Sequence, residues 1–208
     1  MEGRERSGIP QGQIDLTSRF LNESELAGGH HLIVGSVWPT EGQLLSTVTR
    51  EFAGTVVEVG SWVGVSTLYL VRGLVEAQAG HLYAVDPHTG SILHKRRGVE
   101  DTEIYLRENL VRADVEDWVT IIRSTSEEAL RTWTSGPVDI LFIDGSHKYK
   151  DVLIDYYGWF PYTRPGSIII FHDSDSAGVG RVINEHVRLD KSLVEFDSIR
   201  RVKIFRRE

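Results

Sequence analysis

The 208-residue sequence contains no cysteine, and none of its apolar runs is long enough to cross a membrane. Without cysteine the chain has no disulfide, no thiolate metal site and no cysteine nucleophile. A membrane span needs roughly 18–20 apolar residues, and a signal peptide needs an apolar core that the first residues lack. We therefore expect a cytoplasmic protein that has no membrane partner.

Positive charge is also in short supply, with 23 Lys and Arg against 30 Asp and Glu and a formal net charge of −7. This balance argues against a nucleic-acid partner. The length suits one α/β domain with a sizeable core. Residues 1–13 are polar and contain glycine, which predicts a flexible tail, and residues 14–208 show no internal linker or repeat. We expect those residues to form a single domain.

Strand-like and helix-like segments alternate along the chain. The predicted strands are residues 56–59, 81–85, 119–122, 138–143 and 167–171, with a closing pair at 194–196 and 201–205. The predicted helices are residues 14–27, 42–52, 66–79, 103–113, 126–133, 149–160 and 179–188. Such alternation is typical of an α/β fold, in which a parallel sheet is covered by helices on both faces.

A glycine-containing turn follows the first predicted strand, in the stretch VVEVGSWVGVS from Val56 to Ser66. A strand, a glycine turn and a helix start together form a cofactor cradle. A dinucleotide pattern begun at Gly60 needs glycine where the sequence has Trp62 and Val65, and no GxxxxGK[ST] phosphate loop occurs. Glu58 would repel phosphate but suits a cationic ligand. S-adenosylmethionine (SAM), which carries an amine and a sulfonium, therefore fits better than NAD or ATP.

Polar residues gather where the predicted strands end, which is where parallel sheets bind their ligands. These residues are Gly60–Gly64, Asp86, Ser124–Ser126, Asp144–His147 and His172–Asp175. Asp86 has the place and spacing of a carboxylate that binds both ribose hydroxyls, or it is a turn residue before Pro87. Glu58 needs a partner because it is buried. That partner is the ligand's amine, a loop amide or an arginine.

Two acidic and histidine-containing clusters follow neighbouring predicted strands. Asp144, His172 and Asp173 form a candidate site for Mg²⁺ or Mn²⁺, since both ions prefer oxygen-rich ligand sets. Consecutive strand residues point to opposite faces. Both residues of the His172-Asp173 pair can therefore ligate only if the strand has already ended. The alternative is that the aspartates cap turns and His172 fills a gap.

His147 is the candidate general base for a hydroxyl substrate, because histidine titrates near neutrality. The alternative is that it only orients Asp144 or Asp173. Residues 87–102 lack periodicity and contain a basic run at 94–97. A gap of this length predicts either a functional lid or a mobile loop.

Three motifs together resemble the class I SAM-dependent methyltransferases: VVEVGSWVGVST, HLYAVDPHTG and VDILFIDGSHKYKDVLIDYYGWFPYTRPGSIIIFHD. The resemblance spans roughly residues 41–173. It is strongest to small-molecule O-methyltransferases of the macrocin and mycinamicin sugar type and to the cephalosporin-biosynthesis methyltransferases. It implies a Rossmann-like, seven-stranded and mostly parallel sheet whose last strand is antiparallel. It also suggests a homodimer.

The resemblance further implies roles for single residues. The methionine part of SAM would be held by Glu58 and the turn residues Gly60, Ser61, Gly64 and Ser66. Asp86 would hold the ribose, and the adenine would lie near Ser126. Asp144 would take part both in cofactor binding and in catalysis, with His147 as the catalytic base. Metal-dependent members bind Mg²⁺ through the aspartate that matches Asp144 and an acidic pair after the next strand. That pair is His172-Asp173 here, so a softer ion or no metal is an alternative.

The expected function is therefore O-methylation of a small-molecule hydroxyl, with a divalent metal assisting. By resemblance the acceptor is a sugar hydroxyl on a natural product, and a catechol-like phenol is the second choice. Two alternatives are a metal-independent methyltransferase and a SAM-binding module without catalysis. A nucleotide-dependent oxidoreductase is disfavoured by Trp62 and Val65.

Overall fold

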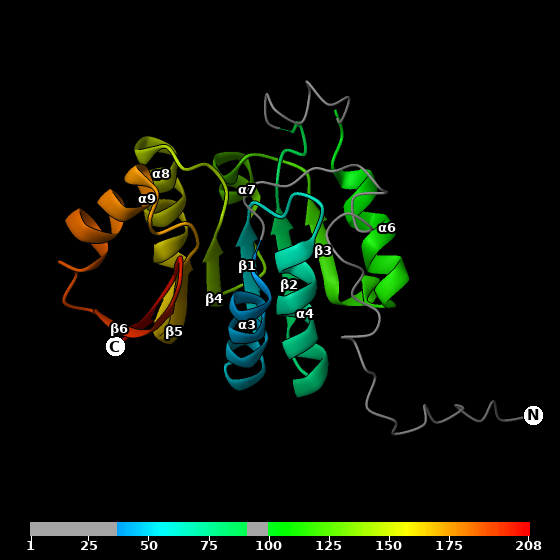
Figure 1. Ribbon diagram of the computed structural model, residues 1–208, viewed down its shortest axis with the longest axis horizontal. Coiled ribbons are helices and arrows are strands. Elements are labelled where there is room, and N and C mark those ends of the chain that lie inside the picture. Colours follow the sequence, from blue (N-terminus) through cyan, green and yellow to red (C-terminus); the bar gives the residue numbers. More distant parts are fainter. Residues whose placement is uncertain (1–36, 91–99) are drawn as a thin grey trace, which may run out of the picture.

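The structure, a computed structural model, describes residues 37–90 and 100–208 (Figure 1). The predicted tail at 1–13, the predicted helix at 14–27 and the basic run at 94–97 lie outside the described residues. No helix in the described ranges combines the length and the apolar character that a membrane crossing requires.

Seven strands form one sheet in the order β3-β2-β1-β4-β5-β7-β6. They are β1 (Thr55–Val59), β2 (His81–Val85), β3 (Val119–Ile122), β4 (Val138–Ile143), β5 (Thr163–Phe171), β6 (Leu193–Ile199) and β7 (Val202–Arg207). Strands β1 to β5 pair in parallel, and β7 is antiparallel to both β5 and β6. This confirms the predicted mostly parallel sheet with its last strand antiparallel.

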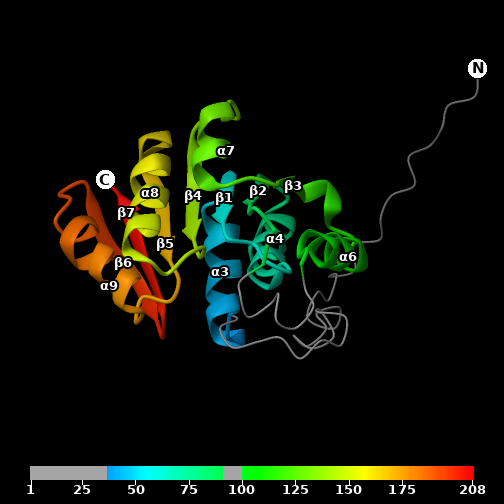
Figure 2. The ribbon, with the colours of Figure 1, turned by 90° about the horizontal axis from the view of Figure 1, so that it is seen from above.

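Within the described residues, six α-helices cover the sheet. They are α3 (Pro39–Glu51), α4 (Val65–Ala77), α6 (Glu103–Ala113), α7 (Ser126–Thr132), α8 (Tyr149–Trp159) and α9 (Ala177–Val182). Helices α3 and α4 lie on one side of the sheet, and α7 and α8 lie on the other (Figure 2). The last predicted helix begins two residues early, at Ala177, and continues as a π-helical turn over Ile183–Val187.

Each central strand contributes side chains to two separate hydrophobic cores, one on each face of the sheet. Val56 belongs to the core beneath α3, α4 and α6, whereas its neighbour Val57 belongs to the core beneath α7, α8 and α9. Ile168 and Ile169 divide in the same way on β5. The strands are nearly all apolar because both of their faces are buried.

The predicted strand at 167–171 is longer than expected, since β5 begins at Thr163. Its first residue pairs with Val138, and the register then shifts before Ile140 pairs with Ile168. The Pro165-Gly166 pair lies in this irregular part, where both residues are poor strand formers. Strand propensity therefore did not indicate that the strand begins at Thr163.

The arrowheads of β1, β2 and β4 point to the same, upper edge of the sheet in Figure 1. The residue after a strand continues the ladder there by donating its N–H to the last residue of the neighbouring strand. The hydrogen bonds are Gly60 N to Val85 O (2.9 Å), Asp144 N to Val59 O (2.8 Å) and His172 N to Ile143 O (3.1 Å). This register brings residues from distant parts of the chain together at one edge.

Candidate active site

A cavity of about 570 Å³ opens at this edge of the sheet, a size typical of small-molecule sites. Most of the predicted site residues line it: Gly60, Ser61, Ser66, Asp86, Ser126, Asp144, His147 and Asp173. Three predicted site residues do not line it, namely Glu58, Gly64 and His172.

Two positions in the turn after β1 require glycine, because of their backbone conformation and because a side chain has no room there. Gly60 has a φ of +91°, and a Cβ atom there would lie 2.4 Å from the carbonyl oxygen of Asp144. Gly64 precedes the first residue of α4 with a φ of +97°, and its Cβ would lie 2.5 Å from Leu106. Both positions favour the residue without a side chain. The first glycine also lets the turn pack directly against the backbone of Asp144.

Ser61 has a buried hydroxyl for which no hydrogen-bond partner exists among the described residues, and it lines the cavity. Buried polar atoms are almost always paired. The start of α4 lies in the same turn, where backbone N–H groups lack partners within the helix. These donors fit a polar, amino-acid-like ligand such as the methionine part of SAM.

Glu58 does not line the cavity, and within the described residues its partners are two hydroxyls and not the loop amide or arginine offered as alternatives; its predicted contact with the ligand's amine stays a prediction. Its carboxylate is fully buried and accepts hydrogen bonds from the hydroxyls of Ser66 (2.5 Å) and Thr67 (2.6 Å). Burial raises the pKa of Glu58 to about 8, and the two hydroxyls only partly oppose this. Glu58 reaches the cavity through Ser66, which lines it.

Asp86 lines the cavity and joins two loops. Its Oδ2 accepts the backbone N–H of Trp62 at 2.9 Å, and its Oδ1 accepts that of His88 at 2.6 Å. Each carboxylate oxygen can accept more than one hydrogen bond. The free acceptor positions are compatible with the predicted binding of ribose hydroxyls.

Ser126 lies at the start of α7 and lines the cavity beside the buried Asp155. Its hydroxyl accepts a hydrogen bond from the Trp159 indole at 2.7 Å. Burial raises the pKa of Asp155 to about 6, against the opposing effect of its hydrogen bond with Ser126. Sequence reasoning missed Asp155, which looks like an ordinary polar position of a helix.

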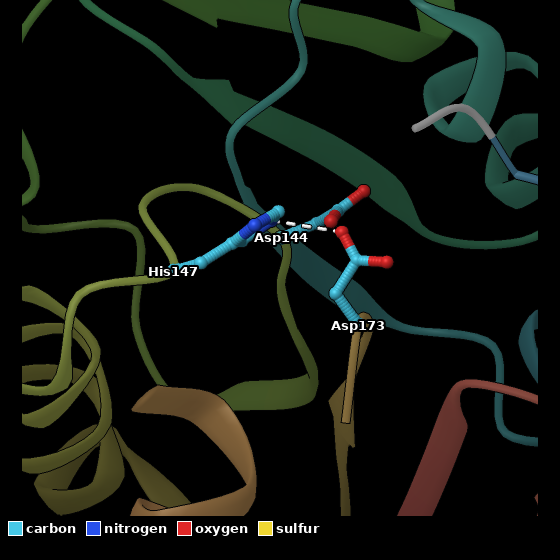
Figure 3. A group of neighbouring side chains, drawn as sticks. All are labelled: Asp144, His147 and Asp173. Atoms are coloured by element: carbon cyan, nitrogen blue, oxygen red, sulfur yellow. Dashed lines mark ion pairs between the residues drawn. The ribbon is translucent and has the colours of Figure 1, made fainter. Parts of the chain in front are cut away.

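Asp144, His147 and Asp173 meet where β4 and β5 end (Figure 3), and all three line the cavity. His147 Nε2 lies 2.8 Å from Asp173 Oδ2, and one ligand atom from each of the three residues falls within 4.8 Å of the others. Strand β5 has ended by this point, and Asp173 has a φ of +49°. This left-handed backbone conformation is rare for a residue other than glycine and often marks a functional site.

The ring of His172 lies outside this group, which corrects its predicted role as a metal ligand. Its Nδ1 is 2.9 Å from Asp144 Oδ1, and its Nε2 is 3.2 Å from Glu41 Oε2. Both ring nitrogens are therefore engaged by carboxylates, behind the cavity wall. His147 takes its place in the cluster, and the ligand set to consider is Asp144, His147 and Asp173.

Two further residues hold the cluster from behind, and sequence reasoning found neither. Arg201, in the turn between β6 and β7, donates a hydrogen bond from Nη1 to Asp173 Oδ1. Glu41, near the start of α3, is fully buried and contacts His172. An acidic residue in the first turn of a helix is common on exposed helices, so the sequence carries no signal for this burial.

The carboxylates and the basic side chains of this cluster shift one another's pKa values. The hydrogen bond to Asp173 raises the pKa of His147 above its usual value, although burial opposes it. Burial raises the pKa of Asp173, but its hydrogen bonds with His147 and His172 outweigh this and lower it below the ordinary range. His147 and Asp173 therefore behave as a pair in which the carboxylate keeps its charge and the imidazole is made more basic.

Residues 57–174 match the protein-family model described as "Methyltransferase domain". The chain is 31% identical over 121 residues to the uncharacterized protein y4gI of Sinorhizobium fredii, a match that spans 58% of this chain and 13% of that protein. It is 27% identical over 160 residues to the catechol O-methyltransferase of Mycobacterium tuberculosis, spanning 69% of this chain and 66% of the relative. The chain thus covers less than two thirds of the length of both curated relatives.

Among solved structures, the fold resembles the O-methyltransferase TomG of Streptomyces achromogenes, which is involved in tomaymycin synthesis and was solved in complex with SAM. The TM-score is 0.69, and the match covers 96% of this chain and 91% of that one. At 16% sequence identity the likeness concerns the fold alone.

Proposed function

This chain belongs to the methyltransferase domain family, and on that basis we propose that it transfers the methyl group of SAM to a hydroxyl group of a small molecule. The observation that carries the proposal is the pairing of His147 with Asp173 in the cavity that the glycine turn also lines. The SAM complex of TomG and the catechol O-methyltransferase of M. tuberculosis support the choice of cofactor and of reaction.

SAM would lie along the turn after β1. The unpaired hydroxyl of Ser61 and the start of α4 would bind its methionine part, and Asp86 would accept hydrogen bonds from its ribose. Ser126 lies on the wall where the resemblance places the adenine. Glu58 would act through Ser66, because a carboxylate behind that hydroxyl favours a positive charge in the cavity.

His147 would be the general base. In the neutral tautomer whose Nε2–H donates to Asp173, the Nδ1 atom is free to accept the proton of the substrate hydroxyl. The substrate oxygen then forms a bond to the methyl carbon while the bond from that carbon to sulfur breaks. The sulfonium becomes the neutral thioether of S-adenosylhomocysteine, and the proton stays on His147.

The acidic cluster also fits a divalent cation. Asp144 Oδ1 faces His172, which leaves its Oδ2 to ligate. Both oxygens of Asp173 are engaged, Oδ1 by Arg201 and Oδ2 by His147, so Oδ2 would ligate through its second acceptor position. Such supporting contacts are typical of metal ligands. We propose that Asp144 and Asp173 would hold the ion and that His147 keeps its role as base. A bound divalent ion would lower the pKa of a nearby substrate hydroxyl.

A metal-independent reaction is the second candidate. It is favoured by the same two contacts, because His172 and Arg201 already place positive charge beside both carboxylates. A chelator separates the two candidates. After treatment with excess EDTA, we expect methyl transfer to fall at least about tenfold and to return when Mg²⁺ or Mn²⁺ is added. Full activity in excess EDTA would instead select the metal-independent reaction.

The acceptor proposed first is a sugar hydroxyl of a natural product, on the strength of the motif resemblance, and a catechol-like phenol is the second choice. The relative from M. tuberculosis favours the phenol. Radiolabelled SAM offered with matched sugar and catechol acceptors would rank the two classes by labelled product. If SAM binds but no hydroxyl compound is labelled, the chain is better described as a SAM-binding module.

A further inference from the structure

Glu41 is a carboxylate that the proposed reaction does not use, yet it is fully buried. It lies in the first turn of α3 and does not line the cavity. Burying a carboxylate is costly unless its partners compensate. The identity of those partners therefore indicates what the residue does.

One oxygen of Glu41 faces His172. The Oε2 atom lies 3.2 Å from His172 Nε2, across 131 residues of sequence. The other ring nitrogen, Nδ1, lies 2.9 Å from Asp144 Oδ1. The imidazole is thus held at both ends, and its position relative to Asp144 depends on Glu41.

The second oxygen of Glu41 faces Arg201. The backbone N–H of Arg201 donates to Oε1 at 3.3 Å, across 160 residues of sequence. The guanidinium of the same arginine donates to Asp173 Oδ1. One carboxylate therefore touches both residues that hold the two aspartates of the cluster.

Helix capping does not account for this arrangement. Glu41 also accepts the N–H of Trp38 at 2.9 Å, which satisfies one donor at the start of α3. A capping contact of this kind forms equally well on an exposed helix. It explains neither the burial of Glu41 nor its contacts with two segments more than a hundred residues away.

We infer that Glu41 is a positioning residue that sets the placement of Asp144 and Asp173 relative to each other, through His172 and Arg201. The inference rests on the proposed function, since it assigns Glu41 to the same site. It adds α3 and the turn between β6 and β7 to the elements on which methyl transfer depends.

The variant Glu41→Gln tests this with little change in shape. We expect its kcat to fall about 10–100-fold, the usual cost of losing a contact that orients a functional group. The Kd for SAM should stay within about twofold, because Glu41 contacts neither Asp86 nor the turn at 60–66. A kcat equal to that of the control variant would overturn the inference.

Asp139→Asn is the matched control. Asp139 also accepts a backbone N–H, from Thr55 at 2.8 Å, and pairs with an arginine, Arg164 at 2.6 Å. It lies near the start of β4, at the opposite end of that strand from Asp144. We expect this variant to lose stability while its kcat stays within about twofold of the unmodified protein, because the contact is remote from the cluster.

A readout without turnover keeps this test separate from that of the proposed function. The imidazole NMR signals of His172, assigned with His172→Gln, should move in Glu41→Gln and not in Asp139→Asn. Signals that do not move would refute the positioning role. If the signals move while the unmodified protein methylates nothing, the proposed function fails and the positioning stands.

Should Glu41→Gln fail to fold, His172→Gln removes the same link from its other end. The same fall in kcat is then expected, again with SAM affinity unchanged. A His172→Gln variant that retains full kcat would contradict the inference.

Discussion

On the proposed cofactor side, at the ends of β1 and β2, Glu58 and Asp86 accept hydrogen bonds from neutral donors, two hydroxyls and two backbone N–H groups. At the ends of β4 and β5, Asp144 and Asp173 are paired with basic groups, His172 for the first and His147 and Arg201 for the second. Asp86, Asp144 and Asp173 line one cavity, and Glu58 lies behind its wall.

This difference has an electrostatic consequence. Burial raises the pKa of Glu58 to about 8, and the nearby Asp144 and Asp86 add to this rise. Burial also acts to raise the pKa of Asp173, but the hydrogen bonds with His147 and His172 lower that pKa overall. Glu58 is thus a carboxyl that a positively charged ligand would ionise, whereas the basic groups beside Asp173 already keep that carboxylate charged. Asp144 is intermediate, because burial raises its pKa and His172 opposes this. A sulfonium cofactor fits the first environment, and a proton-transfer pair fits the second.

The largest effect is expected from His147→Ala. Removing the general base should lower kcat by about 10²–10⁴-fold. The Kd for SAM should hardly change, because the contacts proposed for SAM are with the turn at 60–66 and Asp86 and not with His147. Steady-state kinetics and titration calorimetry measure the two quantities, and His81→Ala, at the start of β2, is the control. Equal losses in kcat and SAM affinity would assign His147 to the cofactor side.

Asp86→Asn is expected to have a smaller effect, and to weaken SAM binding instead of lowering kcat. The loss of a charged acceptor should raise the Kd for SAM by about tenfold, or ~1.4 kcal/mol. At saturating SAM, kcat should stay near that of the unmodified protein. Calorimetry with SAM checks this, with Asp139→Asn as the control. An unchanged Kd would remove Asp86 from the cofactor site.

The last prediction concerns stability and leaves activity aside. Because the pKa of Glu58 is raised on folding, from 4.5 to about 8, its contribution to stability is present below pH 4.5 and is lost as the pH rises through about 8. Glu58→Gln does not titrate. Without SAM, its melting temperature should therefore gain on that of the unmodified protein between pH 5 and pH 8. At about 1.4 kcal/mol per pKa unit the change in stability is about 3–4 kcal/mol, and each 1 kcal/mol is worth ~2–4 °C. If the difference in melting temperature between the two proteins is the same at pH 5 and at pH 8, Glu58 is not protonated in the folded chain.

Much of the fold could be predicted because its signals are local. Strand β1 is an apolar run followed by glycines, and β2, β3 and β4 have the bounds that their sequence patterns predict. The edge-of-sheet rule then placed Asp86, Asp144 and His147 at one cavity. These inferences need only periodicity, turn chemistry and the common direction of parallel strands.

The partners of the buried charges could not be predicted. His172 follows a strand just as Asp144 does, and the sequence cannot tell that its ring turns behind the cavity toward Glu41. The sequence predicts that Glu58 binds an amine, whereas in the structure two hydroxyls of α4 donate hydrogen bonds to its carboxylate.

The sequence by itself determined the order of the strands and helices, the glycine turn and the edge at which the polar residues gather. Only the tertiary structure decided which of those residues face the cavity and which support it from behind. The physical reason is that burial and charge pairing depend on contacts such as Glu41 with Arg201, which join segments 160 residues apart. No local pattern encodes a contact of that kind.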